Sequence, residues 1–244
     1  MSESNAELLP AAGSGETPTI TKFQSLVGRL LWVASCTRPD IAFAVHKPSR
    51  RTHCPTIADW KLAKRILRYL SGTKSLSLLM GGDSSVRREL EVIDYSDADF
   101  AADKLDRKSV TGGFITMDAM AVGWTCKKQG GVALSTMEAE YTAASMIGQE
   151  ILGIRGLLGE LEVACVQPVE IRVDNQAALT QIEGEKASSK AKPIYVRIKF
   201  VVHYTKKGVL KPQYWKSGCT PADVFTKVLA APRIDKLRTF VGLH

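Results

Sequence analysis

The sequence lacks a long apolar run and any closely paired cysteines. Its apolar stretches fall short of the roughly 20 residues that span a bilayer, and the polar residues 1–6 are unlike a secretory signal. The five cysteines are scattered and never spaced as Cys-x-x-Cys, which argues against a disulfide framework and against a zinc site. We therefore expect a soluble protein of the reducing intracellular environment, in the cytoplasm, with no membrane partner.

The bulk composition is that of a globular protein with a basic bias. The chain has 244 residues, of which 45% are hydrophobic and 24% charged, which suits one large domain or a moderate domain plus a smaller one. The formal net charge of +8 favours polyanionic partners. A basic protein without such a partner is the alternative that charge alone leaves open.

The first third of the chain has the pattern of a polar tail followed by helices. Residues 1–21 are rich in Ser, Gly, Glu, Thr and Pro, which predicts a disordered tail or linker. Apolar residues at helical spacing predict helices over 23–34, 41–45 and 56–70. A stretch of glycine and serine at 81–85 then indicates a domain boundary.

The third of these helices carries a stripe of cations at helical spacing: Lys61, Lys64, Arg65 and Arg68. In most helices such a stripe is a solvated face. Because no acid is interleaved with the four cations, the stripe also suits the phosphate backbone of a nucleic acid. The sequence leaves both interpretations open.

The rest of the chain alternates between the two periodicities. Strands are predicted over 90–97, 113–117, 120–125, 169–173 and 209–215, and helices over 135–161, 175–182, 194–206 and 221–229. This order predicts an α/β domain built on a mixed sheet: three strands come first, then a helix, a strand, two helices, a strand and a last helix.

Four carboxylates lie where such a fold brings chain segments together: Asp97, Glu140, Asp174 and Asp223. A cluster of carboxylates is electrostatically costly unless divalent cations occupy it. Asp97 also suits turn chemistry, Asp174 a helix N-cap, and Asp223 a capping arrangement. Only the set of four indicates a metal site.

Helical geometry separates Glu140 from its neighbour Glu138. At about 100° per residue, Glu140 falls on the apolar side of the helix over 135–161, with Ile147 and Ile151. Glu138 points roughly 160° away, toward solvent. Because a buried acid needs partners or a metal, Glu140 is the functional candidate and Glu138 a surface residue.

The sequence motifs around these residues resemble those of the RNase H domain of copia-type LTR retrotransposon polyproteins. The matching stretches are 95–101 (YSDADFA), 106–113 (DRKSVTGG), 124–129 (WTCKKQ), 133–141 (ALSTMEAEY), 173–178 (VDNQAA) and 222–227 (ADVFTK). The first half is similar to the thumb and connection that follow the polymerase palm, in 26–32 (LVGRLLW), 37–41 (TRPDI) and 63–70 (AKRILRYL).

The resemblance implies an RNase H-like five-stranded mixed sheet flanked by helices, preceded by a small helical segment. The implied parts are a tail (1–21), a thumb and connection remnant (22–85), an RNase H domain (89–230) and a C-terminal tail (231–244). Asp97, Glu140, Asp174 and Asp223 map to the family's metal site, which takes two Mg²⁺ ions, with Mn²⁺ as a substitute. For an active element, the virus-like particle and the nucleus are expected locations in addition to the cytoplasm.

The implied reaction is hydrolysis of the RNA strand in an RNA–DNA hybrid by two bound metal ions. Residues expected to contact nucleic acid are Lys61, Lys64, Arg65, Arg68, Lys127, Lys128, Asn175 and Gln176. The upstream polymerase domains of an intact polyprotein are the other expected partner. No Asp-Asp polymerase motif occurs in the sequence, so reverse transcription is not expected of this chain alone.

The sequence departs from the family in two places. The stretch after the first acid reads Asp99-Phe100-Ala101-Ala102 where members usually have Asp-Trp-Ala-Gly, and 192–200 lacks both histidines and an acid of the usual pattern. The alternative function is therefore a catalytically inactive relic that at most binds nucleic acid. The thumb-like first half argues against a third interpretation, an RNase H-like resolvase or integrase.

Overall fold

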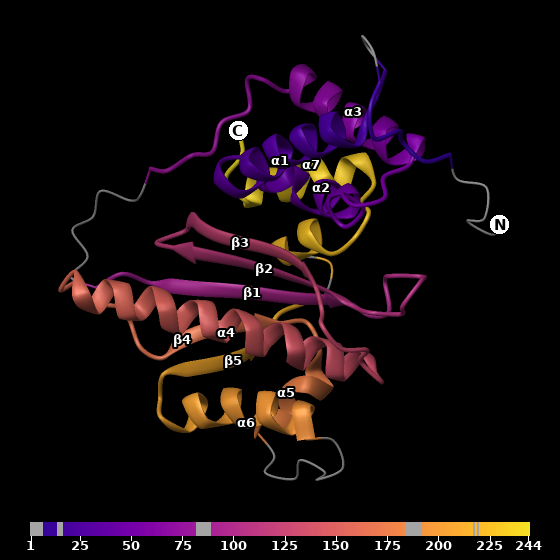
Figure 1. The fold of residues 1–244 in the computed structure, drawn as a ribbon. Helices are drawn as coiled ribbons and strands as arrows, with labels where there is room; N and C mark the ends of the chain where they lie inside the picture. The colour runs from indigo at the N-terminus through magenta and orange to yellow at the C-terminus, as the bar shows by residue number, and fades with distance from the viewer. Residues whose placement is uncertain (1–6, 14–16, 82–88, 184–191, 217, 219) are drawn as a thin grey trace. The chain divides into compact units, whose positions relative to one another are not determined.

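The computed structural model describes residues 7–13, 17–81, 89–183, 192–216, 218 and 220–244 (Figure 1). The chain forms two units, residues 1–78 with 243–244 and residues 79–242. Most of the boundary expected at 81–85 lies outside the described residues. Within the described part, no helix combines the length and apolar character needed to cross a bilayer.

The smaller unit is helical, as its apolar spacing predicts. It contains α1 (Ile20–Cys36), a short 3₁₀ turn η2 (Pro39–Ile41), α2 (Ala42–Ser49) and α3 (Ile57–Gly72). One face of each α-helix supplies the buried core, with Phe23, Val27, Val45, Ala63 and Ile66 among its members. The start of α3 is fixed by a capping box in which the Thr56 and Asp59 side chains accept each other's backbone N–H.

The N-terminal segment differs from the prediction of a disordered tail. Leu9 is buried in the helical core, and its N–H donates to the Pro55 carbonyl at 2.9 Å. The N–H of Ile57 donates in turn to the Glu7 carbonyl at 2.9 Å. A single buried leucine in a polar segment has no periodicity to reveal it, so the sequence pattern missed this contact.

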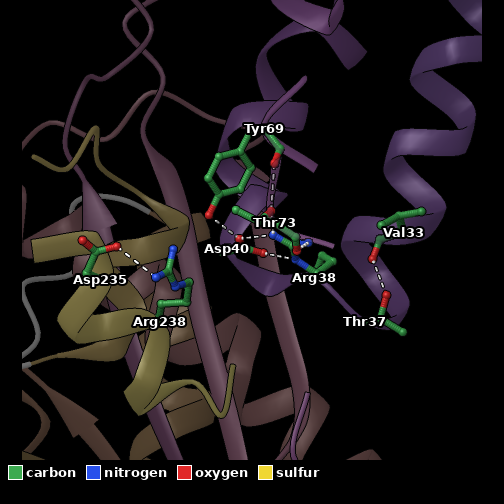
Figure 2. A network of polar contacts seen from close by, with 8 residues as sticks. All are labelled: Val33, Thr37, Arg38, Asp40, Tyr69, Thr73, Asp235 and Arg238. Atoms are coloured by element: carbon green, nitrogen blue, oxygen red, sulfur yellow. Dashed lines mark hydrogen bonds and ion pairs between the residues drawn. The ribbon is translucent and has the colours of Figure 1, made fainter. Parts of the chain in front are cut away.

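Arg38 joins the turn after α1 to the end of α3 (Figure 2). Its guanidinium donates two hydrogen bonds to the Asp40 carboxylate, at 2.9 and 2.8 Å. It also donates to the carbonyl and the hydroxyl of Thr73, at 3.1 and 2.8 Å. The Tyr69 hydroxyl donates to Asp40 at 2.7 Å. Arg38 and Asp40 therefore form a buried polar junction between helices.

The larger unit is built on a five-stranded mixed sheet, and this prediction is confirmed. Its strands are β1 (Val92–Asp99), β2 (Val110–Met117), β3 (Met120–Lys128), β4 (Val169–Val173) and β5 (Leu210–Tyr214), in the order β3-β2-β1-β4-β5. The first three strands are antiparallel, whereas β4 is parallel to both β1 and β5.

Helices flank this sheet. The long α4 (Thr136–Glu160) runs along one face (Figure 1), and α5 (Gln176–Glu183) and α6 (Lys192–Lys206) complete the layer. The core between sheet and helices includes Val92, Ile115, Ile147, Ile151 and Ile171. Arg197 of α6 donates to the Thr142 hydroxyl of α4 at 3.0 Å, so part of the divergent stretch 192–200 packs on α4.

The end of the chain differs from the prediction of one helix over 221–229 and a tail. The helix is only a 3₁₀ turn, η3 (Pro221–Phe225), because Thr226 leaves helical geometry with φ −122°. A further helix, α7 (Ala231–Phe240), follows, with Pro232 in its first turn. Its apolar content is too sparse for the pattern to reveal it. Leu243 then pairs with Leu78 in the smaller unit.

Two adjacent glycines let elements approach both faces of β2. A Cβ on Gly113 would lie 2.1 Å from the Ile147 Cδ1 of α4. A Cβ on Gly112 would lie 2.6 Å from the Thr226 Cγ2 and 2.8 Å from the Ala222 carbonyl oxygen. Gly112 is the cross-strand partner of Asp97. The missing side chains therefore let η3 and α4 pack close to Asp97.

Asp94 is an unpaired acid in the core beneath α4. Its register partners on the two neighbouring strands are Ile115 and Ile171, both core residues. The side chain is fully buried, and neither carboxyl oxygen has a hydrogen-bond partner among the described residues. Burial raises the pKa of Asp94 well above its ordinary range, so the folded unit favours the protonated carboxyl.

We expect Asp94→Val to stabilise the larger unit. The change removes a buried polar group without partners, which is worth about 1–3 kcal/mol. Because the unfolded chain ionises Asp94 at lower pH than the folded chain, the gain grows as the pH rises above the ordinary carboxyl range. Urea unfolding at pH 5 and pH 8 measures both effects.

The matched control is Ser96→Ala, since the Ser96 hydroxyl is also buried without a partner among the described residues but does not ionise. Its effect should not change with pH. A loss of stability in Asp94→Val at both pH values would contradict this account of Asp94.

Candidate metal centre

Three of the four predicted carboxylates meet at the ends of the parallel strands. Asp97 lies near the end of β1, Asp174 directly follows β4, and Glu140 lies in the second turn of α4. One ligand oxygen from each lies within 4.8 Å of the others. The carboxyl ends of neighbouring parallel strands are where α/β sheets form their sites, and this sheet follows that rule.

Asp97 is buried and held from the η3 side. The Thr226 hydroxyl donates to one of its oxygens, and the Lys227 ammonium donates to the other at 3.0 Å. Burial raises the pKa of Asp97, while the Lys227 charge and the Thr226 hydrogen bond lower it. The two donors therefore orient this carboxylate and partly offset the cost of burying it.

Glu140 is buried on the apolar side of α4, where helical geometry places it. Only 6% of the residue is exposed. Its Oε1 accepts from the Ala98 N–H at 3.3 Å, whereas Oε2 is buried and has no partner among the described residues. Burial, followed by the charges of Asp97 and Asp174, raises the pKa of Glu140 to about 9. A cation beside Oε2 would relieve this.

Asp174 lies just before α5, next to a residue that caps this helix. The cap is Asn175, whose side-chain oxygen accepts from the Ala178 N–H at 3.1 Å. The Tyr141 hydroxyl, next to Glu140 in the chain, donates to the Ala178 carbonyl. This contact holds the start of α5 against α4 and so keeps Asp174 close to Glu140.

Asp223 is buried and does not join the three-carboxylate group. Lys227 donates to one of its oxygens at 2.6 Å, and Arg233 donates to the other. Lys227 thus links Asp223 to Asp97. Burial lowers the pKa of Lys227, but the charges of Asp97 and Asp223 outweigh it and raise that pKa well above its ordinary range.

Glu138 has a structural role that the prediction of a plain surface acid missed. Its side chain accepts from the Leu134 N–H at 2.6 Å, and its own N–H donates to the Ser135 hydroxyl at 3.1 Å. Glu138 therefore belongs to the N-terminal cap of α4, and it is not part of the carboxylate group.

The residues predicted to contact nucleic acid fall into three groups. Lys61, Lys64, Arg65 and Arg68 are exposed on α3 of the smaller unit. Lys127 and Gln176 are exposed on the larger unit, and Asn175 serves as the α5 cap. Lys128 forms ion pairs with Asp103 and Asp106, both at 2.6 Å, so its charge is already compensated.

No local signal in the sequence marks the cations and the hydroxyl that surround the acids. Thr226 and Lys227 lie within the quoted stretch 222–227, but the sequence offered no sign that they contact Asp97. Arg233 lies outside the matched words. An arginine near an acid in sequence is too common to indicate a pairing.

The donor set fits a divalent metal ion. Hard cations such as Mg²⁺ and Mn²⁺ take carboxylate oxygens, and Asp97, Glu140 and Asp174 offer one each within 4.8 Å. Glu140 Oε2 is buried and accepts no hydrogen bond among the described residues, and such an ion would give it a partner. For a second ion to use Asp223, Lys227 must release it.

Comparisons with known proteins find retrovirus-related Pol polyproteins of transposons. The chain is 36% identical over 222 residues to the retrovirus-related Pol polyprotein from transposon TNT 1-94 of Nicotiana tabacum, covering 91% of this chain and 16% of that protein. It is 32% identical over 223 residues to the one from transposon RE1 of Arabidopsis thaliana, covering 91% and 15%. The chain thus spans about a sixth of the length of these relatives.

Among solved structures, LC11-RNase H1 in complex with an RNA/DNA hybrid matches at 17% identity and a TM-score of 0.42, covering 60% of this chain and 98% of that chain. No family model matches the chain.

We expect the metal-free stability of the larger unit to fall as the pH rises from about 5 to about 9. The folded pKa of Glu140, about 9, exceeds its unfolded value, so the folded state binds more protons across this range. For each extra proton that the folded state binds, the free energy of unfolding falls by up to about 1.4 kcal/mol for every unit by which the pH rises. Urea unfolding in EDTA at pH 5, 7 and 9 measures the slope.

Glu140→Gln should reduce this slope, and the remainder should come from the other carboxyls with a raised pKa, Asp94, Asp97 and Asp99. Saturating Mn²⁺ should flatten the slope of the parent chain, because a bound cation favours the ionised carboxylates. A slope that is unchanged in Glu140→Gln would contradict the account of Glu140.

Lys227→Met should lower the metal-free melting temperature and increase the stabilisation that Mn²⁺ provides. The change leaves Asp97 and Asp223 without their shared cation, so a metal ion gains what the lysine supplied. Thermal unfolding with and without Mn²⁺ measures the difference. Lys236→Met, an exposed lysine of α7, is the control. Equal Mn²⁺ stabilisation in the parent and Lys227→Met would contradict the proposed competition.

Proposed function

Because the chain belongs to the retrovirus-related Pol polyproteins of copia-type transposons, we propose that it hydrolyses the RNA strand of RNA–DNA hybrids. The reaction is that of an RNase H-type endonuclease and depends on divalent metal ions. The larger unit carries this activity. The smaller unit is the thumb and connection remnant, and its partners in a full polyprotein are the polymerase domains.

One observation carries the proposal. Asp97, Glu140 and Asp174 lie within 4.8 Å of one another although two of them are buried. Such a group has no stabilising role in a metal-free core, because each added carboxylate raises the cost of ionising the others. A cluster that persists against this cost is best explained by ligand binding.

Asp97, Glu140 and Asp174 would hold the Mg²⁺ ions, with Mn²⁺ as a substitute, and Asp223 would contribute once Lys227 releases it. When bound, two such ions activate a water molecule and stabilise the leaving 3′-oxygen. The chain's own part is to hold these carboxylates in place. Thr226 orients Asp97, and the Ala98 N–H orients Glu140.

Substrate contacts are proposed for exposed polar groups of each unit. Gln176 follows Asp174 by two residues and is exposed, so its amide suits hydrogen bonds to the sugar or base edge of the hybrid. Lys127 and the cation stripe of α3 suit phosphate groups. Lys128 is a weaker candidate than Lys127, because Asp103 and Asp106 already compensate its charge.

The test is cleavage of a hybrid with a labelled RNA strand by the purified chain in Mg²⁺. Asp97→Asn and Glu140→Gln should each lower the rate by on the order of 10²-fold or more, since a metal ligand supplies several kcal/mol of transition-state stabilisation. Glu138→Gln is the matched control on the same helix. It should keep nearly full activity, with a small loss of stability from the weakened cap.

Binding without cleavage by the parent chain would overturn the nuclease and favour the alternative, an inactive relic that binds nucleic acid. The ion pairs that Lys227 and Arg233 make with Asp223 favour that alternative, since a metal ion must compete with them. A loss in Glu138→Gln as large as that in Glu140→Gln would overturn the assignment of Glu140.

A further inference from the structure

Gln129 is a buried polar residue at the point where β3, β2 and α4 meet. It follows the last residue of β3, and only 3% of it is exposed. Its N–H donates to the Ser109 carbonyl at 2.9 Å, which keeps the chain beside the start of β2. A buried amide side chain is costly unless its groups are satisfied, so its partners reveal what it does.

The side-chain amide of Gln129 donates two hydrogen bonds, to different elements. One goes to the Thr111 hydroxyl of β2 at 3.0 Å, and the other to the Ala139 carbonyl of α4 at 2.9 Å. Ala139 directly precedes Glu140. Gln129 therefore holds the first turns of α4 at a defined position along the sheet.

The contacts close a circuit around Glu140. Thr111 is the cross-strand partner of Ala98, and the Ala98 N–H is the group that binds Glu140 Oε1. The circuit runs from Gln129 to Thr111, across to Ala98, on to Glu140, and back through Ala139. A shift of α4 along the sheet would break the Gln129 hydrogen bond and the Ala98 hydrogen bond together.

The apolar contacts around Gln129 do little to fix the position of α4 along the sheet, so hydrogen bonds must do so. The residues between α4 and this end of the sheet form a cluster of alanines: Ala98, Ala133, Ala139 and Ala143. Such small side chains allow close approach but do not interlock, so they resist sliding of the helix poorly. The directional bonds of Gln129 supply the missing restraint.

We propose that Gln129 is a positioning residue of the metal site: its two hydrogen bonds set α4 on the sheet so that Glu140 keeps one oxygen on Ala98 and presents the other to the cation. Gln129 does not touch the metal ion or the substrate. This inference rests on the proposed metal site but does not require that the chain cleave RNA.

The test is a double-mutant cycle on metal affinity in the full chain. Isothermal titration with Mn²⁺ is carried out on the parent, Gln129→Met, Glu140→Gln and the double variant. Methionine keeps the volume of glutamine and removes the donors. Gln129→Met should weaken Mn²⁺ binding by about 10–100-fold, the range for groups that orient a metal ligand.

Coupling separates positioning from a general structural role. In the Glu140→Gln background, Asp97 and Asp174 remain as ligands, and Gln129→Met should change the Mn²⁺ affinity by less than about 2-fold. Equal losses in both backgrounds would mean that Gln129 only stabilises the fold, which would overturn the proposal.

The matched control is Thr116→Val. The Thr116 hydroxyl donates to the Ile93 carbonyl at 3.3 Å at the other end of β2, so its loss also removes a buried hydrogen bond. Stability should fall while Mn²⁺ affinity stays unchanged. A fall in affinity as large as that of Gln129→Met would overturn the proposal.

Gln129→Asn is the second variant if Gln129→Met does not fold. It keeps the amide but is one methylene too short to reach both partners, so an intermediate loss of Mn²⁺ affinity is expected. Parent-like Mn²⁺ binding by the variants would overturn only the role of Gln129. No Mn²⁺ binding by the parent chain would overturn the metal site as well.

Discussion

The main constraint on the larger unit is the electrostatic repulsion among the carboxylates that its fold brings together. Asp97 and Glu140 are buried, and Asp174 lies within reach of both. Without a metal ion, the chain limits this repulsion by holding Glu140 protonated and by placing Lys227 on Asp97. The same arrangement makes the site receptive to divalent cations, because a bound ion replaces both measures at once.

Close packing at the ends of β1 and β2 makes that cluster possible. Gly112 admits η3, with Thr226, to the face on which Asp97 lies. Gly113 admits α4 to the other face through Ile147. The acids therefore come together because small residues let η3 and α4 approach a single strand. In our proposal, Gln129 then fixes the position of α4 along the sheet.

Much of this unit follows from periodicity. The strand over 169–173 is observed where it is predicted, and α4 differs by one residue at each end from the prediction of 135–161. The burial of Glu140 follows from its position on the apolar face of α4. The alternation of β1 places Asp94 and Asp97 on opposite faces, and the core position of Asp94 agrees with it.

Other features had no local signal. Leu9 packs in the helical core of the smaller unit from a polar segment, and α7 carries a proline in its first turn in a region of few apolar residues. The Asn175 side chain, directly after Asp174, caps α5 by accepting the Ala178 N–H. Glu138 caps α4, although its position alone suggested a surface acid.

The sequence by itself determined the order of the five strands and of α4, α5 and α6, the face on which Glu140 and Asp94 lie, and the four acids worth considering. Those properties repeat over two to four residues, so neighbours in the chain reveal them. Only the tertiary structure decided that Asp223 pairs with Lys227 and Arg233, and that Thr226 binds Asp97 across 129 residues of chain. Contacts of that kind depend on the path of the whole backbone, to which local spacing is blind.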